Sequence, residues 1–525
     1  MGENLKASKP VRVKAAGGRR NWTVMVYLGG DNNLSEQMVT TLKSLRNAGL
    51  HNHDEVYIAA CFDSVYPTVK TSYYLFDEKV GTGTKQKKDV FDFRVPGTGH
   101  STDVKEPGTA EQLPDFVKWC AENCPADNYC LILSGHGDAF RGKTLMFDES
   151  PSDAVPIDTL RGALDKARRY LPVKNGRRRF AVFGFDNCAM STIEIAFELR
   201  DIADYMVASE GWVPQSGWEY EGPLNFLIDD PKCSAKDLAD RFVTDFVDYE
   251  YDYAIGGRSV DLGVCDLKTL ERNNNLNIVT RLGQLGTVLS GIFKNVPPKP
   301  DEIFAQNLFK KLITNAHWNA QTFFYEQTVD IYDLCKCLIE ECKGMEPFLT
   351  PTGNGTKARG KKTDSMTAIS EQLRSLIKAC ENVLSTQDFF VSNKVAGPAF
   401  RFSEGISVFL PWSRISFLSC RDTYKRTRFF KDQSFNCRPW FDFIDQFTKA
   451  TMRIKSEAAP QKNDFEFNVS GTGAVTMTGG KHKTGGMFKT GGMFKTGGMF
   501  RGELDVLKDH FSTYKNYDIR WQVKE

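Results

Sequence analysis

The feature that most constrains the fold is a repeated order of short apolar segment and amphipathic helix between residues 21 and 230. The apolar segments are nearly continuous, which is typical of strands covered on both faces. The segments between them are long enough to connect parallel strands. The pattern predicts an α/β fold with a doubly wound, mostly parallel sheet. The expected strands are residues 22–28, 56–62, 130–134, 180–185 and 205–209, and the expected helices are residues 35–47, 109–122, 157–170 and 191–199.

The chain divides into four regions by composition. Residues 1–20 form a basic tail, residues 21–230 the α/β core, residues 231–450 a helix-rich part, and residues 451–525 a Gly/Thr/Lys-rich tail. In that tail the hexapeptide KTGGMF occurs three times in succession. A six-residue unit is too short for a helical solenoid repeat, so we expect a flexible tail, with a small β-hairpin or a partner-binding motif as alternatives.

Composition excludes several classes of protein. The 68 Lys+Arg and 66 Asp+Glu leave a net charge of +2, so overall charge favours neither nucleic acid nor a membrane surface as partner. No run of about 18 uncharged apolar residues is present, and residues 1–20 lack the apolar stretch of a secretory signal. The 13 cysteines show no repeating spacing, which favours a reducing compartment, and we expect a cytoplasmic protein.

Two expected strands end in reactive side chains. His136 follows the segment LILSG, and Cys188 follows FGFDN. Because ligands of an open α/β sheet lie beyond the carboxyl ends of its strands, the two side chains can meet in one crevice. Their separation of 188 − 136 = 52 residues leaves room for one crossover helix between adjacent parallel strands.

This pair of residues predicts nucleophilic catalysis by a thiol. His136 would act as general base toward Cys188, and the helix expected from residue 191 would favour the thiolate. The backbone N–H groups of Gly137 and Cys188 would form an oxyanion hole. Taken singly, Cys188 is more typical of a small core residue and His136 of a turn residue, but their joint position favours a dyad.

These residues resemble the clostripain family of cysteine peptidases. The similar stretches are WTVMVYL with DNNL at residues 31–34, SGHG at residues 134–137, GFDNC at residues 184–188, and residues 198–220, with a weaker likeness to about residue 450. The resemblance implies a caspase-like α/β/α sandwich, and endopeptidase activity after Arg or Lys in peptide or protein substrates. It implies no required cofactor and no resident metal. Calcium stays open because the family includes calcium-dependent members, although no EF-hand-type loop is present.

A basic side chain of the substrate needs an acidic partner. Asp186 would share the side of Cys188 by strand alternation and accept a guanidinium or ammonium group, or would instead cap the following helix. Trp218 would form an apolar wall for the stem of that side chain, and Glu210, Glu219 or Glu221 would add charge. The segment GWVPQS departs from the acidic loop usual in the family, which leaves the choice between Arg and Lys open.

Family members commonly mature by cutting themselves between the His and Cys strands. We expect processing at Arg141 or Lys143, with the basic turn at residues 175–179 as the second choice. A further hypothesis is that the repeats, each of which carries a lysine, enter the cleft as pseudosubstrate.

Three other interpretations compete with the peptidase. Residues 137–144 fit the phosphate-loop pattern GxxxxGK[ST], but Pro151 leaves little room for the helix that such a loop needs. Cys335, Cys337 and Cys342 favour burial over zinc binding because they lie in a helical pattern. Finally, the fold could serve as a scaffold or partner-binding protein with latent activity, or as a related separase-like or gingipain-like peptidase.

Overall fold

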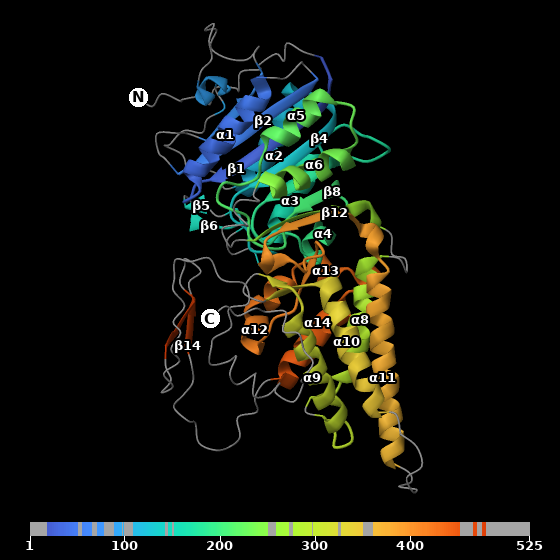
Figure 1. Cartoon of the computed structure of the whole chain (residues 1–525). Helices are drawn as coiled ribbons and strands as arrows, with labels where there is room; N and C mark the ends of the chain where they lie inside the picture. Colours follow the sequence, from blue (N-terminus) through green and yellow to red (C-terminus); the bar gives the residue numbers. More distant parts are fainter. Residues whose placement is uncertain are drawn as a thin grey trace. The chain divides into compact units, whose positions relative to one another are not determined.

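An eight-stranded mixed sheet organises the α/β part of the chain, in the order β12-β9-β8-β7-β4-β1-β2-β3 (Figure 1). Five adjacent strands, from β8 to β2, are parallel, while β3, β9 and β12 pair antiparallel. The strands are β1 (Arg20–Gly30), β2 (Val56–Ser64), β3 (Ser72–Leu75), β4 (Ala126–Ser134), β7 (Phe180–Asp186), β8 (Ala203–Ala208), β9 (Val260–Asp266) and β12 (Phe390–Ala396).

The protein is represented by a computed structural model with two compact units, residues 1–450 and 451–525, each described by itself. The described residues are 18–50, 55–65, 71–77, 89–96, 98, 109–141, 145–146, 148–149, 152–249, 259–271, 277–296, 298–323, 327–349, 361–451, 466–469 and 475–478.

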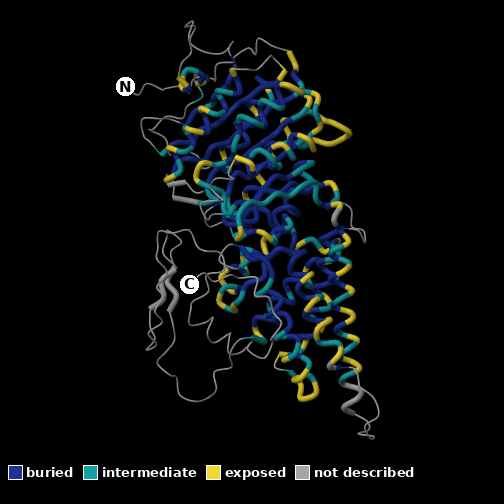
Figure 2. The backbone as a smooth tube through the Cα atoms, viewed as in Figure 1, coloured by how far each residue is buried: buried dark blue, intermediate teal, exposed yellow. Residues whose placement is uncertain are grey.

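Helices cover both faces of the sheet because side chains alternate along each strand. In β1, Val24 and Val26 join one core with α1 (Ser35–Leu50), α5 (Glu221–Asp229) and α6 (Ala235–Tyr249). Met25 and Tyr27 join the opposite core with α2 (Thr109–Asn123), α3 (Ile157–Arg168) and α4 (Ile193–Leu199). Figure 2 shows the sheet buried between these two layers, which confirms the expected α/β/α sandwich with a mainly parallel sheet.

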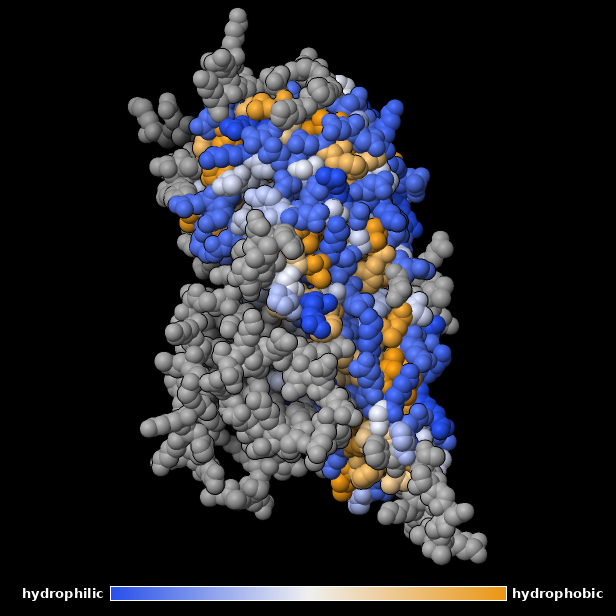
Figure 3. Space-filling model, in the orientation of Figure 1, coloured by the Kyte–Doolittle hydropathy of each residue, from blue (hydrophilic) through white to orange (hydrophobic). Residues whose placement is uncertain are grey.

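A helical region continues from the sandwich. Its longer helices are α8 (Ile278–Ile292), α9 (Ile303–Asn319), α10 (Ile331–Leu349), α11 (Lys361–Leu384), α12 (Arg414–Tyr424) and α14 (Arg438–Thr451). Gly286 lets α8 approach α14 closely, since a methyl group there would lie 2.7 Å from Cα of Trp440. On the face drawn in Figure 3, hydrophilic residues predominate, with apolar residues interspersed along the helices.

The sheet does not end where the sequence led us to divide the chain. The expected boundary at residue 230 separates the first strands from β9 and β12, yet both complete the same sheet. A second sheet of three strands contains β10 (Thr322–Phe323), β11 (Thr328–Asp330) and β13 (Ser407–Phe409). The helical region and the sandwich therefore share one compact unit.

The described part of residues 451–525 is small. It contains a hairpin of β14 (Glu466–Val469) and β15 (Val475–Thr478), whereas the KTGGMF repeats lie outside the described residues. Across the described ranges, we find no helix with the length and apolarity that crossing a bilayer requires.

Candidate active site

The two reactive side chains follow neighbouring parallel strands. Ser134, the last residue of β4, is paired with Asp186, the last residue of β7. The backbone N–H of Gly135 then donates to the Asp186 carbonyl oxygen at 3.3 Å, which continues the pairing one step further. The segments that carry His136 and Cys188 therefore leave the same edge of the sheet side by side.

The two segments are also in direct contact. A Cβ atom at Gly137 would collide with the carbonyl oxygen of Cys188 and would lie 3.1 Å from its nitrogen. The buried side chain of Asn187 donates from Nδ2 to the carbonyl oxygen of His136 at 2.9 Å. Only a residue without a side chain allows this approach, so Gly137 brings the two backbones together.

The ring of His136 is held by a residue to which the sequence analysis gave no role. Its Nε2 lies 2.7 Å from Oδ1 of Asn33, in the turn between β1 and α1. Asn32 stiffens that turn, because its side chain donates to the Gly29 carbonyl oxygen and accepts from the Leu34 N–H, both at 2.9 Å. The motif DNNL, directly after a strand, was visible in the sequence. No sequence rule predicts that residue 33 in this motif contacts residue 136.

The surroundings of Cys188 keep its thiol protonated. Burial raises the pKa of Cys188 to about 11, and the negative charges of Asp186 and Asp261 add to this rise. The Val213 N–H donates to Sγ at 3.4 Å and partly opposes it. α4 begins at Ile193, two residues later than the helix expected from residue 191, so its amino end is five residues from Cys188 in sequence.

The imidazole of His136 is uncharged in the same state. Burial lowers the pKa of His136 from its usual value, so its imidazole is neutral at neutral pH. Among the described residues, Asn33 is the hydrogen-bond partner of the ring, and the ring makes no hydrogen bond to the Cys188 thiol. In this structure Cys188 therefore carries a protonated thiol and His136 a neutral imidazole.

Two backbone amides, those of Gly137 and Cys188, belong to the two loops that meet near the thiol. Neither the N–H of Gly137 nor that of Cys188 donates a backbone hydrogen bond within the described part of the chain. The next residue, Ala189, has a φ of 58°, a backbone conformation that residues other than glycine rarely adopt. The Ala189 N–H donates to the Gly211 carbonyl oxygen at 2.7 Å, which ties this turn to the segment after β8.

Asp186 is buried at the same edge of the sheet, as the last residue of β7. Its carboxylate accepts hydrogen bonds from Ser134 Oγ at 2.9 Å and from Tyr220 OH at 2.8 Å. Burial raises the pKa of Asp186 to about 6. The two hydrogen bonds, and a third from the Trp218 backbone, partly oppose this rise. A Cβ at Gly217, where φ is 72°, would lie 2.8 Å from the carboxylate, so only a hydrogen atom separates that backbone from Asp186.

Trp218, which we expected to line the substrate pocket, is buried in the core. Its ring is 4% exposed, packs on Gly184 of β7, and lies 5.6 Å from the ring of Phe242. Its ring belongs to the core that α6 shares with the sheet, and its backbone is a hydrogen-bond partner of Asp186.

The other candidate acids face different partners. Glu210 is buried and accepts from Ser403 Oγ, from the Gly405 N–H at 2.9 Å, and from Ser407 Oγ at 2.8 Å. Burial, with Asp330 and Asp261 nearby, raises its pKa well above the usual value. These bonds join the segment after β8 to the segment that leads into β13. Glu219 instead accepts from the Gly222 N–H at 2.9 Å, and Glu221 accepts from Asn47 at 3.3 Å.

The expected processing sites differ in accessibility. Arg141 is partly exposed in the turn after His136, whereas Lys143 lies outside the described residues. The turn at residues 175–179 is tight, with positive φ at Asn175 and Gly176 and hydrogen bonds between Lys174 and Arg177. It leads into the amino end of β7, the end opposite to Cys188.

The competing motifs find no support in the described residues. After residues 142–144, which are not described, the chain continues into the hairpin of β5 (Asp148–Glu149) and β6 (Ser152–Asp153), not into the helix that a phosphate loop requires. Cys335, Cys337 and Cys342 are buried. No group of three or more His, Cys, Asp or Glu side chains in the described ranges could hold a metal ion.

A histidine loop and a cysteine loop that touch at the carboxyl edge of a parallel sheet define the class of cysteine peptidases built on an α/β/α sandwich. The chain belongs to the clostripain family, whose model matches residues 26–350.

The individual relatives have low sequence identity to this chain. Clostripain from Hathewaya histolytica is 26% identical over 250 residues, which span 42% of this chain and 44% of that protein, less than half its length. A secreted C11 cysteine protease from Bacteroides thetaiotaomicron, solved with an irreversible peptide inhibitor, has a TM-score of 0.48 at 15% identity and covers 82% of this chain and 99% of its own. An inactive zymogen C11 protease from Parabacteroides distasonis has a TM-score of 0.49 at 16% identity and covers 79% of this chain and 98% of its own.

Proposed function

We propose that this chain is a cysteine endopeptidase that cleaves peptide and protein substrates after arginine or lysine, with Cys188 as nucleophile and His136 as general base and acid. One observation carries the proposal: the contact of Gly137 with the backbone of Cys188, which joins the base, the thiol and two free amides at one edge of the sheet.

The hydrogen bond to Asn33 assigns the two nitrogens of His136 different tasks. An amide oxygen accepts, so Nε2 carries the proton and Nδ1 keeps its lone pair. Nδ1 is then the base that takes the proton of the Cys188 thiol. Asn33 acts as a positioning residue because it fixes both the ring orientation and the tautomer.

The reaction follows from these roles. As Nδ1 takes the proton, Sγ of Cys188 attacks the scissile carbonyl carbon, and the carbonyl oxygen gains negative charge beside the amides of Gly137 and Cys188. The C–N bond then breaks, and the proton on Nδ1 passes to the leaving amine. Water, deprotonated by the same nitrogen, releases the acyl group from sulfur and restores the thiol.

Asp186 supports the preference for a basic side chain. It is a buried carboxylate two residues before the nucleophile, and its pKa of about 6 leaves it ionised at neutral pH. Its bonds from Ser134 and Tyr220 hold it in place for a charge-assisted hydrogen bond with a guanidinium or ammonium group.

The resting pair also supports regulated activity. The protonated thiol and the neutral imidazole share no hydrogen bond, which supports activation when a substrate or a chain cut rearranges the two loops. We propose Arg141 as the site of self-processing because it is partly exposed and follows the His136 loop closely. The basic turn at residues 175–179 is less suited, since a tight turn cannot lie extended in an active site. A partner-binding scaffold with latent activity is the alternative that the same resting state allows.

Hydrolysis of fluorogenic peptides that end in Arg, Lys, Asp or Leu tests the proposal. We expect cleavage after Arg or Lys only, and loss of it in Cys188→Ala. Cys233→Ala is the matched control, because Cys233 is the other cysteine that is not fully buried. The assay is run with and without calcium, and before and after limited trypsin treatment. No cleavage under any of these conditions would favour the scaffold.

A further inference from the structure

A cavity rich in arginine lies at the end of the sheet opposite to the dyad. It has a volume of about 560 Å³ and is lined by seven arginines but only two carboxylates. The arginines come from three places: Arg168 and Arg169 at the end of α3, residues 177–179 before β7, and Arg200 with Arg428 from the segments after α4 and at the start of α13 (Arg428–Lys431). The seven residues of β7 separate this arginine cavity from Cys188 by roughly 20 Å.

The carboxylates near the arginine cavity are shared between several arginines. Asp201 lies 2.8 Å from both Arg161 and Arg428 and 3.8 Å from Arg168, while Glu271 pairs with both Arg177 and Arg179. With Arg161 included, eight arginines face six carboxylates: Asp165, Glu198, Asp201, Asp204, Glu271 and Asp432. Positive charge is therefore in excess.

Burial and neighbouring positive charge both lower the pKa of arginines in this cluster. Burial, followed by the charge of Arg428, lowers the pKa of Arg200 to about 10. Burial is also the main cause of the lowered pKa of Arg161, to which the charges of Arg428 and Arg168 contribute. Guanidinium groups that lower one another's pKa are stabilised when an anion enters between them.

Helix capping explains only some of these arginines. Arg200 donates to the Phe197 carbonyl oxygen at 2.6 Å, and Arg179 donates to the Arg200 carbonyl oxygen at 3.0 Å, as expected where helices end. By contrast, the side chains of Arg169 and Arg177 are 71% and 57% exposed at the rim. Exposed ion pairs such as theirs contribute little stability, so capping does not account for them.

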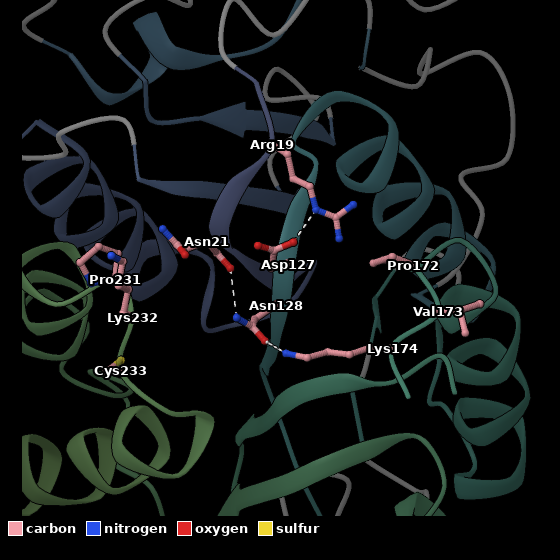
Figure 4. Close-up of a pocket in the computed structure, with 10 residues that line it drawn as sticks. All are labelled: Arg19, Asn21, Asp127, Asn128, Pro172, Val173, Lys174, Pro231, Lys232 and Cys233. Carbon is pink, nitrogen blue, oxygen red and sulfur yellow. Dashed lines mark hydrogen bonds and ion pairs between the residues drawn. The ribbon is translucent and has the colours of Figure 1, made fainter. Parts of the chain in front are cut away.

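The positive surface continues into a neighbouring cavity, which shares Val173 with the first (Figure 4). This second cavity holds Arg19, Lys174 and Lys232 against a single carboxylate, Asp127. Figure 4 shows Arg19 paired with Asp127 and Lys174 bonded to Asn128. Basic side chains therefore extend along the amino ends of β4 and β7.

We propose that the arginine cavity binds a small anion that carries two or more phosphate or sulfate groups. Its volume suits a small molecule, and the planar guanidinium groups match the oxygens of either anion in paired hydrogen bonds. Because the arginines come from separate elements that line the cavity, a ligand with several charged groups would contact more of them than a single phosphate. The site is independent of the proposed peptidase chemistry.

Titration calorimetry on full-length Cys188→Ala, at about 0.15 M salt to screen weak attraction, tests this site. The probes are myo-inositol hexakisphosphate, sucrose octasulfate and inorganic phosphate, which separate phosphate from sulfate ligands and several charges from one. We expect one molecule of a multiply charged probe per chain, and affinity at least about tenfold lower after Arg169→Ala with Arg177→Ala. Arg374→Ala is the matched control because its side chain is 68% exposed on α11.

Thermal unfolding shows whether each variant is folded before its affinity is compared. Binding that weakens only in the double variant supports the site. No saturable binding of any probe, or an equal loss of affinity in Arg374→Ala, would overturn it, since the latter shows general attraction to a basic surface.

Discussion

At the residue scale, Asn33 and Gly137 shape the site through a single hydrogen bond and a missing side chain. In the proposed reaction, the oxygen of Asn33 determines which nitrogen of His136 carries a proton. The missing side chain of Gly137 determines how closely the two loops approach. Both effects act on the Cys188 thiol, although neither residue is a nucleophile or a base.

Replacing Asn33 tests the assignment of the tautomer. Asn33→Ala should lower kcat by about 10–100-fold with little change in KM, because the imidazole loses its orientation but substrate contacts remain. Asn33→Asp keeps an acceptor and adds a negative charge, so it should recover much of kcat and move the acidic limb of the pH–rate profile to higher pH. Steady-state kinetics across pH would contradict the role if both variants lost activity equally and kept the wild-type profile.

Replacing Asp186 tests the source of specificity. Asp186→Asn keeps an oxygen that can accept from Ser134 and Tyr220 but removes the charge, so KM for Arg peptides should rise by about 10–100-fold. In the wild type the same loss should occur as the pH falls through about 6, where the carboxylate becomes protonated. An unchanged preference for basic peptides in Asp186→Asn would place the specificity elsewhere.

At the scale of elements, adjacent ends of β4 and β7 bring together residues far apart in the chain. The strands and crossover helices were predictable because continuous apolar runs and amphipathic periods report burial directly. The short or partly polar elements β3, β9, β12 and α5 were not expected, because their place in the sheet or on its face depends on neighbours distant in sequence. The same holds for Asn33 and for the bonds of Glu210, whereas His136 and Cys188 were readable from motifs at strand ends.

Glu194 gives α4 a pH-dependent link to β13. It is fully buried and accepts from the Phe409 N–H at 3.1 Å, and burial raises its pKa to about 7. An acid whose pKa is raised in the folded state binds its proton more tightly there than in the unfolded chain. Its stabilising contribution is therefore present in full below the usual pKa of about 4.5 and is lost as the pH rises from there to about 7. The loss should be on the order of 3 kcal/mol.

Thermal unfolding between pH 5 and pH 8 measures this contribution. Glu194→Gln keeps an acceptor for Phe409 and cannot ionise, so its melting temperature should fall less than that of the wild type over this range. Glu111→Gln, at an exposed position of α2, is the control and should follow the wild type. Parallel curves for Glu194→Gln and wild type would contradict the account.

At the scale of the whole molecule, the described core of the peptidase unit lies within residues 1–450. Removal of residues 452–525 should therefore change the melting temperature of the remaining chain by less than about 2 °C. A large loss of stability would show that the last segment completes the core.

Substitutions in the KTGGMF repeats test whether residues 451–525 regulate the enzyme. If they act as pseudosubstrate, replacing Lys483, Lys489 and Lys495 by Ala should lower the apparent KM of an Arg peptide and leave kcat unchanged, since a competing basic chain is removed. Replacing Thr484, Thr490 and Thr496 by Ala is the control. Equal kinetics in all three proteins would dismiss the hypothesis.

The most direct test of the central claim is covalent labelling by a peptidyl chloromethyl ketone that ends in arginine, read by intact mass and peptide mapping. The account predicts one adduct per chain, on Cys188, that is retained in Cys233→Ala and strongly reduced in His136→Ala and Asp186→Asn. The matching reagent that ends in leucine should label far more slowly. Labelling of another of the 13 cysteines in place of Cys188, or equal labelling by both reagents, would contradict a His136–Cys188 peptidase with basic specificity.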